Sequence, residues 1–295
     1  MDRCDSCRGI ASCPVCNTTI PSFHHVGVRG THSTLKVPVV DLRISHESQP
    51  SGIWHYSDSC QHRISPPSRS VPIQYRGGPL WKDGYVWQNV YWGTYYSKAS
   101  SKTWIKRLED ATLHIETDEN YSGLLSQYNV GVGTVAAPVV VNKDPAGQIS
   151  NEQVAASLTD WIRNGTVQNL GIKGAYNIFL PPSSTVSLST DISCSSFCDY
   201  HDTVDNAKGP FYTVEPFPCS SSCNQCSNDP FDTLTQGLSE EIVELKTDMD
   251  PGTGWVIGNE EICDFCDHQY VCERISTGEY VNAWYNQEKN ICWKP

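Results

Sequence analysis

The chain is short of basic residues and has no long apolar run. Its 21 Lys and Arg residues are outnumbered by 33 Asp and Glu residues, and the formal net charge is −12. No basic cluster is present, which argues against binding to the phosphate backbone of nucleic acids. No apolar stretch approaches the roughly 18 residues that a membrane-spanning helix requires, so we expect no membrane span. The first residues also lack the charged-then-apolar pattern of a secretory signal peptide.

Cysteine, by contrast, is abundant, with 14 residues in the chain. An even number of clustered cysteines predicts a disulfide framework and an exported protein. The cysteines expected to form it are Cys4, Cys7, Cys13, Cys16, Cys60, Cys194, Cys198, Cys219, Cys223, Cys226, Cys263, Cys266, Cys272 and Cys292. Three Asn-x-Ser/Thr sequons, at Asn17, Asn120 and Asn164, predict N-linked glycans in the same environment. We therefore expect a secreted, extracellular glycoprotein whose signal peptide is not present in this numbering.

The composition of the chain changes near residue 72. Residues 1–71 are rich in Cys, Pro and Ser and contain one convincing strand pattern, Lys36–Ile44. We expect an extended N-terminal arm that packs along its own domain or pairs with a neighbouring copy. A homo-oligomer or an extracellular assembly would follow from such pairing.

Residues 72–295 alternate strand and helix patterns, which predicts one α/β (α+β) domain with a mixed sheet in three layers. The expected strands are Tyr85–Tyr96, Thr134–Lys143, Ala175–Pro182 and Pro210–Pro218. A proline inside Thr134–Lys143 favours an edge strand or a bulge at that point. Helices are expected over Ser100–Ile115 and, from the capping box of Ser150 with Gln153, up to about Arg163.

The segment that follows Asn228 predicts an acidic amphipathic helix. Asp229 is a suitable N-cap residue and Pro230 a suitable first residue. One apolar stripe is formed by Phe231, Leu234, Leu238, Ile242, Leu245 and Met249. Its flank carries Glu240, Glu241, Glu244 and Asp248. Like charges four residues apart cost roughly 0.2–0.5 kcal/mol, so this flank requires water and salt, a cation or a partner to neutralise it.

The order of several segments between Pro72 and Cys292 resembles the exordium / phosphate-induced protein family and its bacterial and fungal relatives. The matching segments are YWGTYY (Tyr91–Tyr96), NIFLPP (Asn177–Pro182), CSSFCDYHD (Cys194–Asp202), YTVEPFPC (Tyr212–Cys219), LTQGLSEEIVELKTD (Leu234–Asp248), EICDFC (Glu261–Cys266) and the terminal Trp284, Asn286, Asn290 and Cys292. The resemblance implies a zincin-like domain, in which a His and a Glu on one helical turn serve a catalytic zinc ion. Here Glu240 stands at the position of that His, and Glu241 stands at the position of the general base.

The same residues leave the identity of a bound ion open. The candidate metal ligands are Glu240, Glu244, Glu261, Asp248, Asp264 and, from outside the helix, His201. An oxygen-rich set suits Ca²⁺, which takes six to eight oxygen ligands, whereas a catalytic Zn²⁺ commonly has imidazole among its three protein ligands.

The replacement of the expected His favours a secreted, non-catalytic glycoprotein of an extracellular matrix, a cell wall or a surface assembly. The first alternative is a secreted zinc-dependent metallohydrolase (a peptidase), with Glu241 as its general base. The second is a glycan-binding module, which would present an exposed row of Trp or Tyr side chains. Metal analysis, together with Glu241→Gln, discriminates the first alternative from the favoured interpretation.

Overall fold

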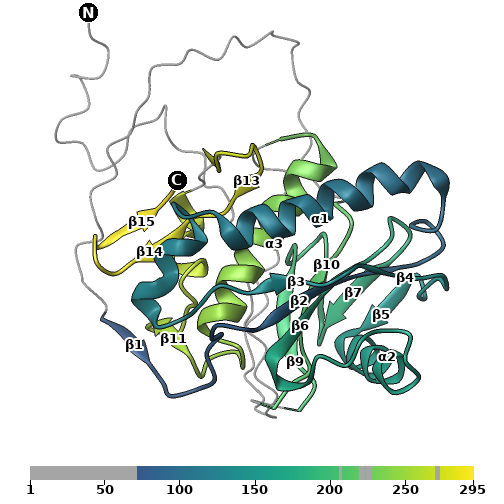
Figure 1. Cartoon of the computed structure of the whole chain (residues 1–295), viewed down its shortest axis with the longest axis horizontal. Helices are drawn as coiled ribbons and strands as arrows, with labels where there is room; N and C mark the ends of the chain where they lie inside the picture. The colour runs from purple at the N-terminus through teal and green to yellow at the C-terminus, as the bar shows by residue number, and fades with distance from the viewer. Residues whose placement is uncertain (1–71, 206–207, 219–222, 224–226, 270–272) are drawn as a thin grey trace, which may run out of the picture.

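A computed structural model describes residues 72–205, 208–218, 223, 227–269 and 273–295 (Figure 1). The described residues form a mixed α/β structure around a six-stranded sheet with the order β3–β2–β6–β10–β9, in which β4 also pairs with β2. These strands are β2 (Val86–Trp92), β3 (Thr134–Val135), β4 (Val139–Val141), β6 (Gly174–Phe179), β9 (Tyr200–Thr203) and β10 (Phe211–Glu215). The central strands β2, β6 and β10 are parallel, and β9 runs antiparallel to β10 at one edge. The expected N-terminal arm lies outside the described residues.

Helices cover both faces of this sheet. On one face, Trp87 and Phe179 share a core with the helices α1 (Lys102–Thr117) and α3 (Pro230–Thr247). On the other face, Tyr176 and Ile178 pack with α2 (Asn151–Arg163). Successive residues of a strand point to opposite faces, which explains why neighbouring residues of β6 join different cores.

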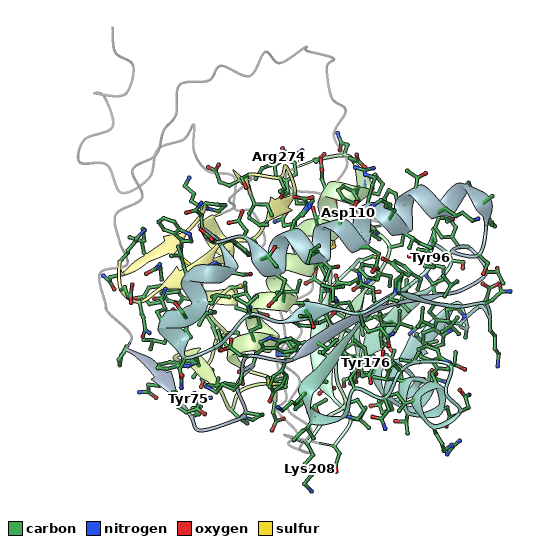
Figure 2. All side chains as sticks on the ribbon, in the orientation of Figure 1. Tyr75, Tyr96, Asp110, Tyr176, Lys208 and Arg274 are labelled. Atoms are coloured by element: carbon green, nitrogen blue, oxygen red, sulfur yellow. A yellow bond between two sulfur atoms is a disulfide. The ribbon has the colours of Figure 1, made fainter. Side chains whose placement is uncertain are left out.

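Smaller elements complete the described part of the chain. Three further sheets are two-stranded: β1 (Ile73–Tyr75) with β11 (Trp255–Ile257), β12 (Glu273–Arg274) with β13 (Tyr280–Val281), and β14 (Trp284–Asn286) with β15 (Ile291–Trp293). A three-stranded sheet contains β5 (Gln148–Ser150), β7 (Thr185–Leu188) and β8 (Asp191–Ile192). The 3₁₀ segments are η2 (Ala99–Ser101), η3 (Ser122–Tyr128), η4 (Gly171–Lys173) and η5 (Asp264–Gln269). Figure 2 shows how densely the side chains fill the space between these elements, with Tyr96 and Tyr176 fully inside it.

Local sequence signals account for several of these boundaries. The capping box at the start of α2 is confirmed, since the Gln153 backbone N–H donates to Ser150 Oγ and Gln153 Oε1 accepts from the Ser150 N–H. The strand expected over Thr134–Lys143 is instead split into β3 and β4, with Pro138 between them. Proline has no N–H to donate to a neighbouring strand, and this explains the interruption.

Disulfides link segments that are distant in the sequence. Cys198 is bonded to Cys223 and Cys266 to Cys292, and Cys194 is also disulfide-bonded. Cys263 departs from the expected framework, because it is a buried thiol whose Sγ lies 4.0 Å from the Glu240 carbonyl oxygen. The remaining cysteines lie outside the described residues. In the part of the chain that the structure describes, no helix has the length and apolar character needed to cross a membrane.

The acidic helix α3 begins as expected, because Asp229 caps it and Pro230 occupies its first turn. Its apolar stripe is buried, as predicted. The acidic flank is buried as well: Glu240, Glu241 and Glu244 are only 4%, 1% and 3% exposed. The strands β9, β10 and β13 and the helix α1 pack around α3. Bulk water and salt therefore do not neutralise this flank, and the first of the three alternatives that the sequence leaves open is wrong.

Candidate metal centre

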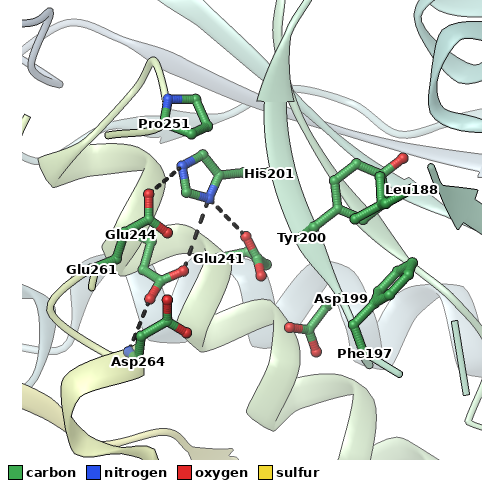
Figure 3. A pocket seen from close by; sticks show the side chains of 10 residues that line it. All are labelled: Leu188, Phe197, Asp199, Tyr200, His201, Glu241, Glu244, Pro251, Glu261 and Asp264. Carbon is green, nitrogen blue, oxygen red and sulfur yellow. Dashed lines mark hydrogen bonds and ion pairs between the residues drawn. The ribbon is translucent and has the colours of Figure 1, made fainter. Parts of the chain in front are cut away.

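The candidate centre lies where α3 meets the edge strand β9 and the loop that follows β11 (Figure 3). His201 projects from β9 toward α3, whereas its neighbour Tyr200 joins the core on the opposite face, as strand alternation requires. Glu241 and Glu244 lie one helical turn apart on α3, and Glu261 comes from the loop. Two segments, α3 and the loop after β11, thus place carboxylates around the imidazole ring that β9 supplies.

The His201 ring contacts three carboxylates. Its Nδ1 lies 3.0 Å from Glu241 Oε2 and 3.9 Å from Glu244 Oε2. Its Nε2 lies 3.5 Å from Glu261 Oε1, a buried oxygen that accepts no hydrogen bond from a described residue. The acidic side of α3, which carries no cation toward these groups, is therefore organised around a single histidine.

A backbone carbonyl determines which ring nitrogen carries the proton. Nε2 of His201 lies 3.0 Å from the carbonyl oxygen of Asp248, and a carbonyl oxygen can only accept. Nε2 therefore carries the hydrogen. Burial lowers the pKa of His201, which favours the neutral ring with a lone pair on Nδ1. That lone pair faces Glu241.

Two acceptors that face each other at 3.0 Å need a proton or a cation between them. The pKa of Glu241 is raised well above its usual value, first by burial and then by the charge of Asp199. One arrangement is therefore a protonated Glu241 that donates to His201 Nδ1. The other is a metal ion held by Nδ1 and the carboxylates. In that case the Nε2–H···O=C bond is the outer contact that usually orients a metal-bound histidine.

The carboxylate of Asp248 serves the backbone instead of the ring. Its oxygens accept hydrogen bonds from the N–H groups of Gly252, Thr253 and Gly254 at 2.7, 2.9 and 2.6 Å. These bonds fix the turn after α3, and with it the carbonyl oxygen that accepts from His201. At Gly254 a side chain has no room, since a Cβ would lie 2.1 Å from the Thr247 carbonyl oxygen. We therefore leave Asp248, an expected ligand, out of the ligand set and assign it to the loop.

Two groups of side chains bring one possible ligand atom per residue within 4.8 Å of one another. The first is His201, Glu241 and Glu244, and the second is Glu240, Glu244 and Asp264. Glu244 belongs to both, and its Oε1 accepts a hydrogen bond from the Asp264 backbone N–H at 3.2 Å. The structure thus brings together the expected residues of the helix, the loop and β9.

Two further acids in this region were not predicted from the sequence. Asp199 precedes β9, and Glu215 ends β10; both are buried. Burial and the charge of Asp199 raise the pKa of Glu215 well above its usual value. Gly237 makes their approach to α3 possible, because a Cβ there would lie 2.1 Å from Asp199 Oδ2. The available signal was Glu215 as the single acid of the strand segment FYTVE and Asp199 as one of two acids beside His201 in the segment CDYHD.

A small cavity of about 20 Å³ adjoins this centre. Phe197 and Pro251 are part of its apolar wall, and its polar wall consists of His201, Glu241, Glu244, Asp199, Glu261 and Asp264. A space of this size holds about one water molecule. The geometry therefore allows an ion and one water, but not a polypeptide substrate within the cavity itself.

The other expected sites fall in separate places. Asn120 and Asn164 are exposed, and Asn17 lies outside the described residues. Among the described aromatic side chains only Tyr75 is exposed, at 45%, so the structure offers no row of exposed aromatic rings for a glycan in this part of the chain. No protein-family model, curated protein or solved structure matches the chain. Its function must therefore be inferred from the chemistry of the site.

Proposed function

We propose that this protein binds a divalent cation through His201 Nδ1, Glu241 and Glu244, with Glu261 beside the ring. One observation carries the proposal: the lone pair of Nδ1 faces Glu241 Oε2 at 3.0 Å while Nε2–H is held by the Asp248 carbonyl oxygen. A histidine so arranged has its outer contact already made and its inner nitrogen directed at carboxylates. A cation placed there satisfies all of these groups at once.

The donor set favours zinc over calcium. Imidazole nitrogen and carboxylate oxygens are ordinary zinc ligands and occur together in sites with two His and one Glu. Ca²⁺ takes six to eight oxygens and does not require an imidazole. Zn²⁺ is therefore the first ion to test, and Ca²⁺ the comparison.

We further propose a non-catalytic role in an extracellular matrix, a cell wall or a surface assembly. The cation would tie β9 to α3 in a disulfide-linked domain, and this supports a structural function. The residue at the general-base position, Glu241, is itself among the proposed ligands, and the adjoining cavity of about 20 Å³ is too small for a polypeptide substrate. The proposal retains the resemblance to the exordium family, with a zincin-like three-layer domain whose metal ligands differ from its relatives. Secretion, N-glycosylation and self-association through residues 1–71 belong to the same proposal.

One observation supports a second candidate function, a secreted metallohydrolase. The cavity beside His201 is large enough for one water, and a zinc-bound water has a pKa lowered to about 7. Such a water is the nucleophile of zinc peptidases. Hydrolysis of a mixed peptide library by the zinc-loaded protein, abolished by a chelator, would favour this candidate over the structural role.

The cation itself is tested on full-length protein secreted from a eukaryotic host and purified without chelator. We expect about one zinc per chain by elemental analysis and a higher melting temperature with Zn²⁺ than after chelation. His201→Asn and Glu244→Gln should lose both. The matched control is Glu109→Gln, which changes a carboxyl on α1 outside the proposed ligand set and should keep the zinc. If the purified protein contains no zinc and Zn²⁺ does not change its melting temperature, the proposal is wrong. A proton on Glu241 then bridges Glu241 and His201 Nδ1 in place of the ion.

A further inference from the structure

An open cavity of about 310 Å³ lies away from the metal centre, between the end of α1 and the turn that joins β12 to β13. Asn120 stands on one side of it, and Ser276 and Thr277 stand on the other. Arg274, which Figure 2 labels at the surface, braces this turn by donating to the Gly278 carbonyl oxygen. The volume is at the lower end of the roughly 300–1,000 Å³ typical of small-ligand pockets.

Asn120 is the first residue of the sequon Asn120-Tyr121-Ser122, and its backbone is fixed on both sides. Its N–H donates to Asp118 Oδ1 at 2.9 Å, and its carbonyl oxygen accepts from Trp293 Nε1 at 2.8 Å. Tyr121 is buried and donates to the Asn282 carbonyl oxygen at 2.7 Å. The Asn120 side chain is exposed, and its amide makes no hydrogen bond to a described residue. The fold therefore presents this amide at the mouth of the cavity.

The walls of the cavity suit a neutral ligand with many hydroxyl groups. Ser276 Oγ donates to Asp118 Oδ2 at 3.3 Å, so the two sides of the cavity are already joined by a polar contact. Nδ1 of His114 is engaged with Glu279, which leaves the Nε2 edge of a half-buried ring for a ligand. The described lining contains no Lys or Arg, and the carboxylates of Asp118 and Glu119 disfavour an anion. A sugar ring matches this chemistry better than a phosphate or a carboxylate.

We propose that Asn120 carries an N-linked glycan whose first N-acetylglucosamine residue occupies this cavity. In the transfer step a bond forms between Asn120 Nδ2 and C1 of the sugar, and the amide loses one proton to a base. The bond between C1 and the pyrophosphate oxygen of a lipid-linked oligosaccharide donor breaks, and that oxygen takes the electron pair. The seated sugar would then tie the end of α1 to the β12–β13 turn.

Asn164 provides an internal comparison. It lies among exposed residues after α2, where its Oδ1 accepts from the Thr166 N–H and hydroxyl at 3.0 and 2.6 Å. A glycan attached there would extend into solvent. The two sequons therefore predict different behaviour for chemically identical modifications in one molecule.

The experiment uses full-length protein secreted from a eukaryotic host and native digestion with an amidase that removes N-glycans. Intact and peptide mass spectrometry should show a glycan on Asn120. When the amidase releases this glycan, Asn120 should become Asp. We expect its native release to be about tenfold slower than that of the Asn164 glycan, as a docked sugar requires. Both glycans should leave at similar rates after denaturation. Ser276→Trp, which fills the cavity at an exposed position, should keep the Asn120 glycan but raise its release rate to that of Asn164.

An unmodified Asn120 would overturn the proposal, and so would a glycan released as fast as that of Asn164 in the native protein. Slow release that Ser276→Trp leaves unchanged would overturn the seating in this cavity. The inference does not depend on the cation: it shares secretion and N-glycosylation with the proposed function, and its mass and release measurements are independent of zinc content. Asn164→Gln serves as the control that the Asn120 glycan behaves identically when it is alone.

Discussion

Lys246 Nζ lies 3.0 Å from Glu116 Oε1, and both side chains are completely buried. Glu116 also accepts from Trp87 Nε1 at 3.0 Å and from the Gly133 N–H. Lys246 is the only cationic residue of α3, and its ion pair with Glu116 holds it against α1 and the sheet, away from the acidic flank. This explains why the carboxylates near His201 receive no compensation from their own helix.

Removal of this lysine should strongly destabilise the fold. Lys246→Met leaves Glu116 buried without its charged partner, and breaking a buried pair in this way typically costs about 3–5 kcal/mol. Urea unfolding of the variant and the parent measures the difference. Lys106→Met is the control, because Lys106 and Asp110 form an exposed pair on α1 and such pairs contribute about 0–1 kcal/mol. Equal effects of the two substitutions would contradict the assignment.

Asp248→Asn should weaken zinc binding although Asp248 is not among the proposed ligands. The substitution removes the negative charge that three backbone N–H groups of the 252–254 turn surround. The Asp248 carbonyl oxygen would then hold His201 Nε2 less firmly. Loss of an outer contact of this kind typically costs about 10–100-fold in metal affinity. Calorimetric titration with Zn²⁺ measures the change.

Asp250→Asn is the matched control for this measurement. Asp250 lies in the same turn, but its backbone carbonyl oxygen, rather than its carboxylate, accepts from Thr253. Zinc affinity should therefore remain close to that of the parent protein. If Asp248→Asn binds zinc as tightly as Asp250→Asn, the turn does not position His201 for the ion.

Glu109 lies outside the metal centre, and its carboxyl should make the free energy of unfolding depend on pH. Its Oε1 accepts from Tyr91 OH at 2.8 Å and Asn89 Nδ2 at 2.7 Å, yet burial dominates and raises the pKa of this carboxyl. The unfolded chain then releases this proton at a lower pH than the folded protein does. The contribution of Glu109 to the free energy of unfolding is therefore largest below the unfolded pKa, falls as the pH rises through the folded pKa, and is constant above it.

Glu109→Gln keeps an oxygen acceptor for Tyr91 and Asn89 but cannot ionise. We expect the variant to be more stable than the parent at pH 7 and to lose this advantage near pH 4. The difference between the two urea-unfolding profiles from pH 4 to 8 isolates the one carboxyl. Asp110→Asn, at the exposed neighbouring position, is the control for the loss of one negative charge on α1, and it should change the stability at pH 7 by no more than about 1 kcal/mol. A Glu109→Gln profile parallel to the parent would show that burial does not shift this group.

The sequence predicts the start of α3 and its apolar stripe because both depend on residues within a few positions of each other. Asp229, Pro230 and the three- and four-residue spacing from Phe231 are sufficient. The burial of the opposite flank was not predictable in the same way. It arises from β9, 40 residues before Glu241, and from the loop that carries Glu261, which follows β11, so no pattern within a few positions of the helix predicts it.

The candidate ligands show the same division. His201 was a candidate because a zinc site needs a nitrogen ligand from outside the helix, but its distance to Glu241 follows from the pairing of β9 with β10 at the sheet edge. Asp248 was expected to be a ligand because its spacing continues the acidic flank. Its carboxylate is instead used by a tight turn whose geometry depends on Gly252 and Gly254. Residue type and spacing therefore predict which segments contribute to the candidate metal centre. The backbone geometry of β9 and of the turn after α3 determines which of their side chains face His201 and which do not.

Gly237 should be intolerant of any side chain, although it lies in the middle of a helix. Alanine is favoured over glycine in helix interiors by about 1 kcal/mol, so propensity alone predicts that Gly237→Ala stabilises the protein. The added Cβ would instead lie 2.1 Å from Asp199 Oδ2 and 3.4 Å from Glu215 Oε2. Overpacking of this kind typically costs about 1–3 kcal/mol. We therefore expect net destabilisation in urea unfolding. Gly123→Ala is the control, because the nearest atom to its Cβ would be 3.5 Å away, and its effect should be small. A stabilising Gly237→Ala would show that Asp199 and Glu215 can move away from α3 without cost, and that their close approach is not required by the fold.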